Sequence, residues 1–167
     1  MSLDTTVGGT TANSYVTVEF ADAFFAAQVV QGVWPTLLAS KEAALLDATR
    51  LIDNQFDFVG DIANTEQSLR WPRSSVYDAD NRLLPTDSIP KTIQQATCYL
   101  AMYLLQNGGF KQTASNVTGV KVGPIDLKFN SSSVVGMPDF VIRLLSSYAT
   151  YTGASQGGAH SVQAVRS

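Results

Sequence analysis

The sequence has a single cysteine, a single histidine and no long hydrophobic run. Cys98 has no second cysteine with which to form an internal disulfide, which is typical of a protein assembled in a reducing cytoplasm. No stretch reaches the roughly 18 consecutive apolar residues that a membrane helix needs, and the first residues lack the basic and apolar regions of a secretion signal. We therefore expect a soluble chain without a membrane partner, stabilised by packing or by other subunits.

Motifs of common catalytic and cofactor sites are also missing. The sequence contains no Walker A motif, no Rossmann glycine fingerprint, no G-x-S-x-G element and no Cys/His metal spacing. His160 lies beyond the last predicted helix, away from any scaffold that could hold a nucleophile against it. Cys98 falls near the apolar stripe of a predicted helix, so we expect a small core residue. We predict that the chain is not an enzyme and binds neither a cofactor nor a metal ion.

Charge is sparse and unevenly distributed. Residues 1–66 hold nine acidic and two basic residues, whereas residues 67–167 hold five acidic and nine basic ones. Affinity for nucleic-acid phosphates is built from clustered Lys and Arg, and here these residues are scattered. Asp78 and Asp80 resemble the start of a calcium loop, but glycine at the sixth position and glutamate at the twelfth are missing, so we expect a polar turn.

Four segments have the apolar spacing of three and four residues that predicts helices. The first covers about 17–30 with Thr17 as N-cap, and the second opens at Ser40 and is the clearest. The third begins at Ile89 or Pro90 and ends at Asn107-Gly108-Gly109, and the fourth begins at Pro138. The pattern predicts a mainly α fold, a small four-helix bundle.

Three further features interrupt or extend this bundle. Val120 and Val122 alternate with Lys121 ahead of a Gly-Pro turn, which predicts a β-hairpin insertion at about 117–130. Residues 57–88 lack sustained periodicity, which indicates a long functional or partner-held loop. Residues 1–14 and 152–167 predict extended arms. We therefore expect one helical domain over 1–151, followed by a flexible C-terminal docking tail over 152–167.

Within the long loop, Leu69-Arg70-Trp71-Pro72-Arg73 places a tryptophan between two arginines. Such a tryptophan can stack on a base, anchor a protein interface, or pin the loop to the helices. The sequence leaves these three roles open.

The joint order of several segments resembles a family of phage proteins described as DnaT-like single-stranded-DNA-binding proteins, which look like head-to-tail connectors. The resemblance spans nearly the whole chain, with a shorter and less glycine-rich joint before the tail than we expect for the family. The matching segments are Asn13-Ser14-Tyr15-Val16-Thr17-Val18, Ala21-Asp22-Ala23-Phe24-Phe25, Lys41-Glu42-Ala43-Ala44-Leu45, Ala48-Thr49-Arg50-Leu51-Ile52-Asp53, Leu69-Arg70-Trp71-Pro72-Arg73, Val76-Tyr77-Asp78-Ala79-Asp80, Ile89-Pro90, Lys121-Val122-Gly123-Pro124-Ile125 and Val165-Arg166-Ser167.

The resemblance implies a structural subunit of the virion neck, a head-to-tail connector (adaptor) of a tailed bacteriophage that assembles in the host cytoplasm. Its copies would form a homo-oligomeric ring of about twelve, docked under the portal protein and joined to tail or nozzle proteins, with DNA passing through the lumen. We expect residues 159–167 to add a β-strand to the portal, with Val162, Val165 and Arg166 making the contacts. At the subunit interface or the lumen we expect Lys121, Asp126 and Lys128, together with Arg70, Trp71 and Arg73.

The alternative is a DnaT-like single-stranded-DNA-binding protein of phage replication. That function needs a basic groove with aromatic side chains set along it. Trp71 with Arg70 and Arg73 supplies one such point. The first third of the chain is acidic, which opposes a basic groove over the rest of the surface.

Overall fold

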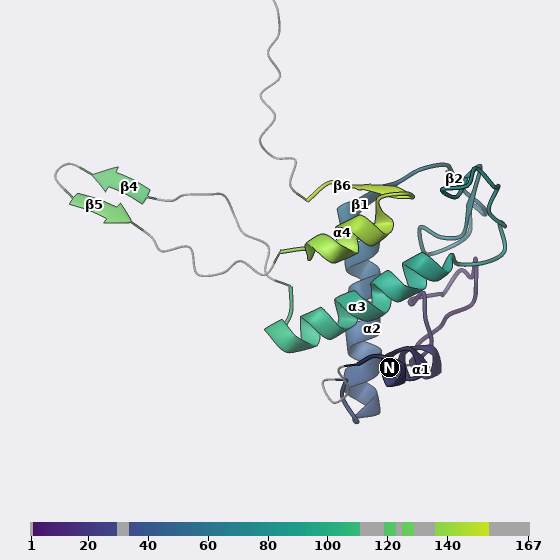
Figure 1. Cartoon of the computed structure of the whole chain (residues 1–167), viewed down its shortest axis with the longest axis horizontal. Helices are drawn as coiled ribbons and strands as arrows, with labels where there is room; N and C mark the ends of the chain where they lie inside the picture. The colour runs from purple at the N-terminus through teal and green to yellow at the C-terminus, as the bar shows by residue number, and fades with distance from the viewer. Residues whose placement is uncertain (1, 30–33, 111–118, 123–124, 129–135, 154–167) are drawn as a thin grey trace, which may run out of the picture.

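The structure is a computed structural model that describes residues 2–29, 34–110, 119–122, 125–128 and 136–153 (Figure 1). Its helices are α1 (Val18–Ala26), α2 (Leu38–Gln55), α3 (Lys91–Asn107) and α4 (Asp139–Leu145). Six short strands form three antiparallel pairs. They are β1 (Phe56–Phe58) with β6 (Ala149–Tyr151), β2 (Asp61–Ile62) with β3 (Arg73–Ser74), and β4 (Gly119–Val122) with β5 (Ile125–Lys128).

Local signals explain most helix boundaries. The Thr17 side chain accepts a hydrogen bond from Phe20 N at 3.1 Å, which confirms the predicted N-cap of α1. Gly108 has a left-handed conformation with φ of 68° and caps α3, as the glycine pair predicts. The predicted start of α2 at Ser40 was late, because the helix begins at Leu38 with Leu37 as an N-cap that offers no side-chain hydrogen bond.

The core lies between α2 and α3, which pack against each other and carry fully buried leucine and isoleucine side chains. The short α1 contacts both long helices, and α4 contacts α3. Figure 1 shows α3 crossing α2 at a steep angle. Four helices are present as predicted, but a four-helix bundle is not shown. Two long helices, two short ones and small sheets make the body, and no described helix is long and apolar enough to cross a membrane.

The β1–β6 sheet was not predicted. It pairs Phe56 with Tyr151 and Phe58 with Ala149, so the chain directly after α2 meets the chain after α4. Thr152 continues the contact, because its backbone N and its hydroxyl both donate to Gln55 O, at 2.9 and 3.1 Å. This sheet closes the body at the end of α2 opposite α1 (Figure 1).

The N-terminal segment has a partner within the chain and folds back on itself, which corrects the expectation of an extended arm. Asp4 and Asn13 close it into a loop through two hydrogen bonds of 2.8 Å. Ser68 then joins it to the 57–88 segment, with its backbone N donating to Gly9 O at 3.1 Å and its hydroxyl donating to Ala12 O. The two segments without helical periodicity therefore stabilise each other.

We predict that Gly60→Ala destabilises the chain much more than Gly108→Ala. Both glycines have a positive φ, 73° and 68°, but a Cβ at Gly60 would lie 2.3 Å from Ser74 O, whereas nothing lies within 4 Å at Gly108. The backbone strain common to both costs about 1 kcal/mol. The clash should raise the loss in the free energy of unfolding for Gly60→Ala to about 3 kcal/mol. Urea unfolding of both variants measures the difference, and equal losses would contradict the β2–β3 geometry.

Candidate functional site

Trp71 lies in the core, with 1% of its surface exposed. Its ring packs edge-on against Phe58 and Tyr148, with 5.9 Å between ring centroids in each pair. The indole N–H has no acceptor among the described residues, so the side chain contributes packing. Of the three roles that the sequence left open, the structure supports the one in which Trp71 pins the loop to the helices. A buried ring is not available for base stacking.

Arg73 is also buried and is bonded to the backbone of its own loop. Its Nε donates to Val59 O at 2.7 Å, its Nη1 to Arg70 O at 3.2 Å, and its Nη2 to Phe58 O at 3.4 Å and to Gly60 O. Burial lowers the pKa of this guanidinium below its ordinary value. These bonds use the planar fork of donors of the arginine, so Arg73 holds the loop together and is not free to bind a phosphate.

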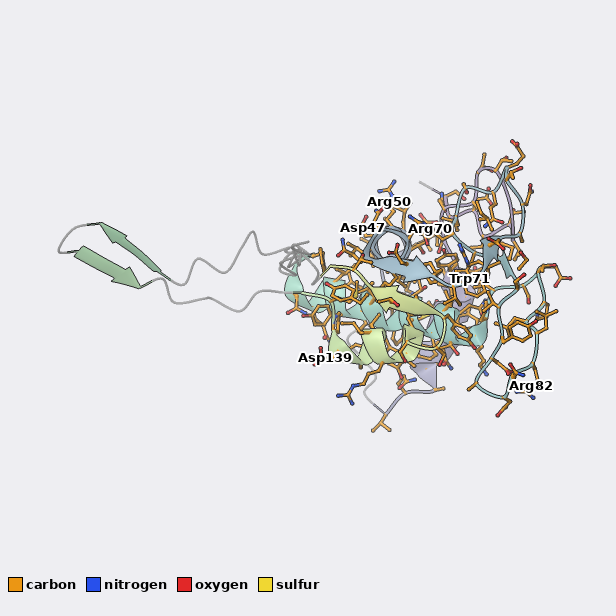
Figure 2. The ribbon with its side chains drawn as sticks, turned by 90° about the horizontal axis from the view of Figure 1, so that it is seen from above. Asp47, Arg50, Arg70, Trp71, Arg82 and Asp139 are labelled. Atoms are coloured by element: carbon orange, nitrogen blue, oxygen red, sulfur yellow. The ribbon has the colours of Figure 1, made fainter. Side chains whose placement is uncertain are left out.

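Arg70, in contrast, is exposed and lines a groove of about 400 Å³ together with Arg50, Asp53 and Asn54. Figure 2 shows Arg50 and Arg70 at one edge of the body, while Arg82 and Asp139 lie elsewhere. Arg50 makes only a loose ion pair of 3.8 Å with Asp47. Two exposed arginines, Arg50 and Arg70, therefore meet in this groove.

Asp53, one of the residues that line this groove, is half-buried and hydrogen-bonded to the buried Tyr15. The Tyr15 hydroxyl donates to Asp53 Oδ1, and Arg70 N donates to Asp53 Oδ2 at 3.1 Å. Burial raises the pKa of Asp53 above its usual carboxyl value, against these hydrogen bonds, which lower it. Burial and the nearby Asp53 carboxylate raise the pKa of Tyr15 well above its ordinary value. The pair ties the N-terminal segment to α2 and to the loop.

The Asp78–Arg82 segment is the polar turn that the sequence predicts. Asp78 Oδ1 accepts from the backbone N of Asp80 and of Arg82, both at 2.9 Å, and the Arg82 guanidinium binds both carboxylates, at 2.8 and 2.9 Å. The hydrogen bond from Arg82 N is the main reason why the pKa of Asp78 is lowered. Among the described residues no group of His, Cys, Asp and Glu could hold a metal ion. Cys98 is buried as expected, and burial raises the pKa of its thiol to about 12.

The predicted hairpin is present, and its register pairs Lys121 with Asp126 and Gly119 with Lys128. Among the described residues its two strands pair only with each other. The predicted portal-docking residues Val162, Val165 and Arg166 lie outside the described residues. Among the described residues, the strands of the hairpin form no pairing with the Leu69–Arg73 motif.

Two apolar surfaces were missed by sequence reasoning. Leu37 and Leu38, 66% and 57% exposed, lie at the beginning of α2. Tyr99 and Leu144 line a hollow between α3 and α4 with Phe140, which is 44% exposed. The sequence contains a signal for both surfaces, namely apolar residues that lie outside the apolar stripe of a helix. Leu37 and Leu38 precede the apolar stripe of α2, and Phe140 lies one position away from the apolar stripe of α4.

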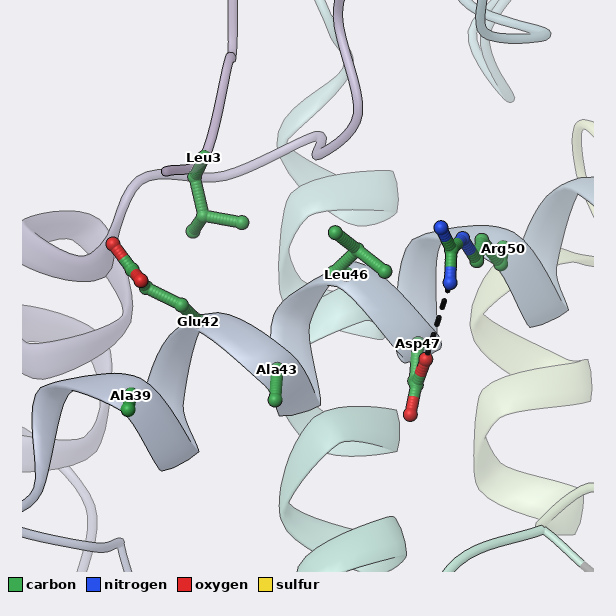
Figure 3. Close-up of a pocket in the computed structure, with 7 residues that line it drawn as sticks. All are labelled: Leu3, Ala39, Glu42, Ala43, Leu46, Asp47 and Arg50. Carbon is green, nitrogen blue, oxygen red and sulfur yellow. Dashed lines mark ion pairs between the residues drawn. The ribbon is translucent and has the colours of Figure 1, made fainter. Parts of the chain in front are cut away.

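A third hollow runs along the outer side of α2 (Figure 3). Ala39, Ala43 and Leu46 form its base, and Leu3 of the N-terminal segment lies over it. Glu42, Asp47 and Arg50 border it, with the Asp47–Arg50 ion pair drawn at one end. Because the side chains of Ala39 and Ala43 are short, few side-chain atoms cover the backbone of α2 at this hollow.

Comparison with known proteins gives one match. A family described as "Putative DnaT-like ssDNA binding protein" matches residues 1–167. No curated protein and no solved structure matches the chain. The description of the family agrees with the alternative expectation, single-stranded-DNA binding, and none of the comparisons bears on a connector.

We predict that Arg73→Met lowers the free energy of unfolding by about 2–4 kcal/mol, because buried carbonyls of the loop lose their donors. Arg70→Met, which removes an exposed guanidinium three residues away, should change it by less than about 0.5 kcal/mol. Urea titration followed by the fluorescence of Trp71 and Trp34 measures both variants. A loss at Arg70 as large as that at Arg73 would contradict the structural role of Arg73.

Proposed function

The chain belongs to the family of DnaT-like single-stranded-DNA-binding proteins, and we propose that within it the chain acts as a structural subunit, a head-to-tail connector of a tailed bacteriophage. The observation that carries this proposal is the exposure of large apolar side chains at the beginning of α2, at Leu37 and Leu38, and on α4, at Phe140. These two parts of the helical body lie toward opposite ends in Figure 1. Large apolar side chains in water are stabilised when another protein surface covers them.

The hairpin and the tail support the same proposal. A two-stranded hairpin is marginal in water, and β4 and β5 pair only with each other among the described residues, so a neighbouring subunit would stabilise them. Lys121, Asp126 and Lys128 are then the candidates for subunit contact or lumen lining. In this proposal the sequence of residues 159–167 adds a strand to the portal, with Val162 and Val165 in pockets and Arg166 at an acidic rim.

The surface charge is compatible with DNA passing through a ring without binding to it. The chain has a net charge of −3, and the aromatic residue of the Leu69–Arg73 motif is buried. A single-stranded-DNA platform needs exposed aromatic side chains along a basic groove. The buried Trp71 and Arg73 therefore favour assembly over base stacking as the function of this chain.

We predict that the full chain, mixed with the portal ring of its phage, adds a mass of about twelve subunits to that ring in mass photometry. A variant that lacks residues 159–167 should fold normally and lose most of this mass increase, because the strand that it would add to the portal is gone. The Arg82→Gln variant, which changes an exposed loop on the body, is the matched control and should bind as wild type. Portal binding that survives the truncation would contradict the role of the tail, and no portal binding by the full chain would reject the connector.

Single-stranded-DNA binding is the second candidate, favoured by the description of the family and by one geometric observation. Arg50 and Arg70 line the same groove, and neither is engaged in a close ion pair among the described residues. The half-buried Asp53 in this groove and the nearby Asp47 offset part of that positive charge. A phosphate contact here would be electrostatic and independent of base sequence.

For this candidate, the double variant Arg50→Gln/Arg70→Gln should weaken binding to a labelled oligothymidine by about tenfold. The slope of the logarithm of affinity against the logarithm of salt concentration should fall by about the amount expected for two phosphate contacts. Arg82→Gln/Lys91→Gln, which removes two exposed cations outside the groove, is the control of equal charge. Fluorescence anisotropy at several salt concentrations measures both. Equal weakening by the two double variants, or no binding by the wild type, would reject the groove as a DNA site.

A further inference from the structure

The beginning of α2 is an apolar helix end without a cap. Leu37 and Leu38 are exposed there, and the helix has neither a side-chain hydrogen bond at its N-cap nor an acidic residue in its first turn. The free N–H groups at such an end favour a nearby negative charge. One turn further on, Glu42 makes no ion pair among the described residues.

The outer side of α4 has the complementary features. The hollow lined by Tyr99, Phe140 and Leu144 presents an apolar surface, and Phe140 is 44% exposed. Asp139 precedes it at the first position of α4, and Arg143 follows at the hollow itself. Arg143 also makes no ion pair among the described residues.

The two surfaces agree in spacing as well as in chemistry. From Leu38 to Glu42 and from Asp139 to Arg143 the separation is four residues, about one helical turn in each case. With the beginning of α2 laid alongside α4, Asp139 meets the uncapped helix end and Arg143 meets Glu42, while the leucines cover the aromatic hollow. Figure 1 shows the beginning of α2 at the lower end of the body and α4 at the upper end, so one chain cannot make this contact with itself.

We propose that the Leu37–Glu42 end of α2 docks into the Tyr99–Phe140–Leu144 hollow of a second copy of the chain, as the head-to-tail contact of a ring. A contact between two different surfaces repeats from copy to copy and closes into a ring when the rotation allows it. The inference rests on the proposed connector function, and it assigns the subunit interface to residues outside the Leu69–Arg73 motif.

Cross-linking of variants with one added cysteine tests the contact. Leu38→Cys and Leu144→Cys add one accessible thiol each, while the buried Cys98, with its pKa raised to about 12, stays unreactive. With a short bismaleimide, the mixture of the two full-length variants should give a covalent dimer at least about fivefold more abundant than either variant alone, as expected for a heterologous contact. Equal dimer from Leu38→Cys alone, or no dimer from the mixture, overturns the inference.

A charge exchange provides a second readout. Glu42→Arg and Arg143→Glu should each weaken self-association about tenfold, because each places two like charges together. The double variant Glu42→Arg/Arg143→Glu should restore self-association, since the two exchanged side chains again carry opposite charges across the contact. Weakening that is additive in the double variant overturns the pairing. The portal experiment stays independent, because a ring that forms on the portal without this cross-link keeps the connector function and rejects only the interface.

Discussion

The buried guanidinium of Arg73 is the constraint on which the rest of the non-helical structure depends. A cation removed from water must have its donors paired, and Arg73 finds its acceptors in the carbonyls of Phe58, Val59, Gly60 and Arg70. These carbonyls belong to two stretches of the long loop, which the guanidinium therefore holds together. Trp71, two positions earlier, inserts into the core and fixes the same loop to the helices.

The consequences reach the N-terminal segment and the surface. Ser68 joins the loop to Gly9 and Ala12, and Asp53 joins the loop and Tyr15 to α2, so the N-terminal segment and the loop form one packed unit without helical periodicity. The tryptophan and one of the two arginines that suggested a nucleic-acid contact are part of this unit. Arg70 remains on the surface in a mixed-charge groove, and apolar side chains are exposed at the beginning of α2 and on α4, which is why we propose assembly as the function.

The helices could be predicted because their signal is local. Apolar spacing, Thr17 and the Gly108-Gly109 pair act within a few residues, and they located α1, α2, α3 and α4 to within a few positions. The β1–β6 and β2–β3 sheets could not be predicted, because strands of two or three residues show no alternation. The β1–β6 sheet in addition joins segments that are far apart in the sequence. The candidate site was predicted only in part. Arg70 is exposed, whereas Trp71 and Arg73 are buried, and a pattern of residues in the sequence does not specify which of the three side chains the fold buries.

By itself, the sequence determined the four helices, the hairpin, the buried cysteine and the polar turn at Asp78, because each follows from neighbours in the chain. The tertiary structure alone decided whether Trp71 faces water or the core, whether the N-terminal segment has a partner, and which apolar residues stay exposed. These depend on contacts between residues tens of positions apart, such as Tyr15 with Asp53 and Ser68 with Ala12. The free energy of such a contact is set by packing and desolvation at one place in space, and no local pattern of residues specifies that place.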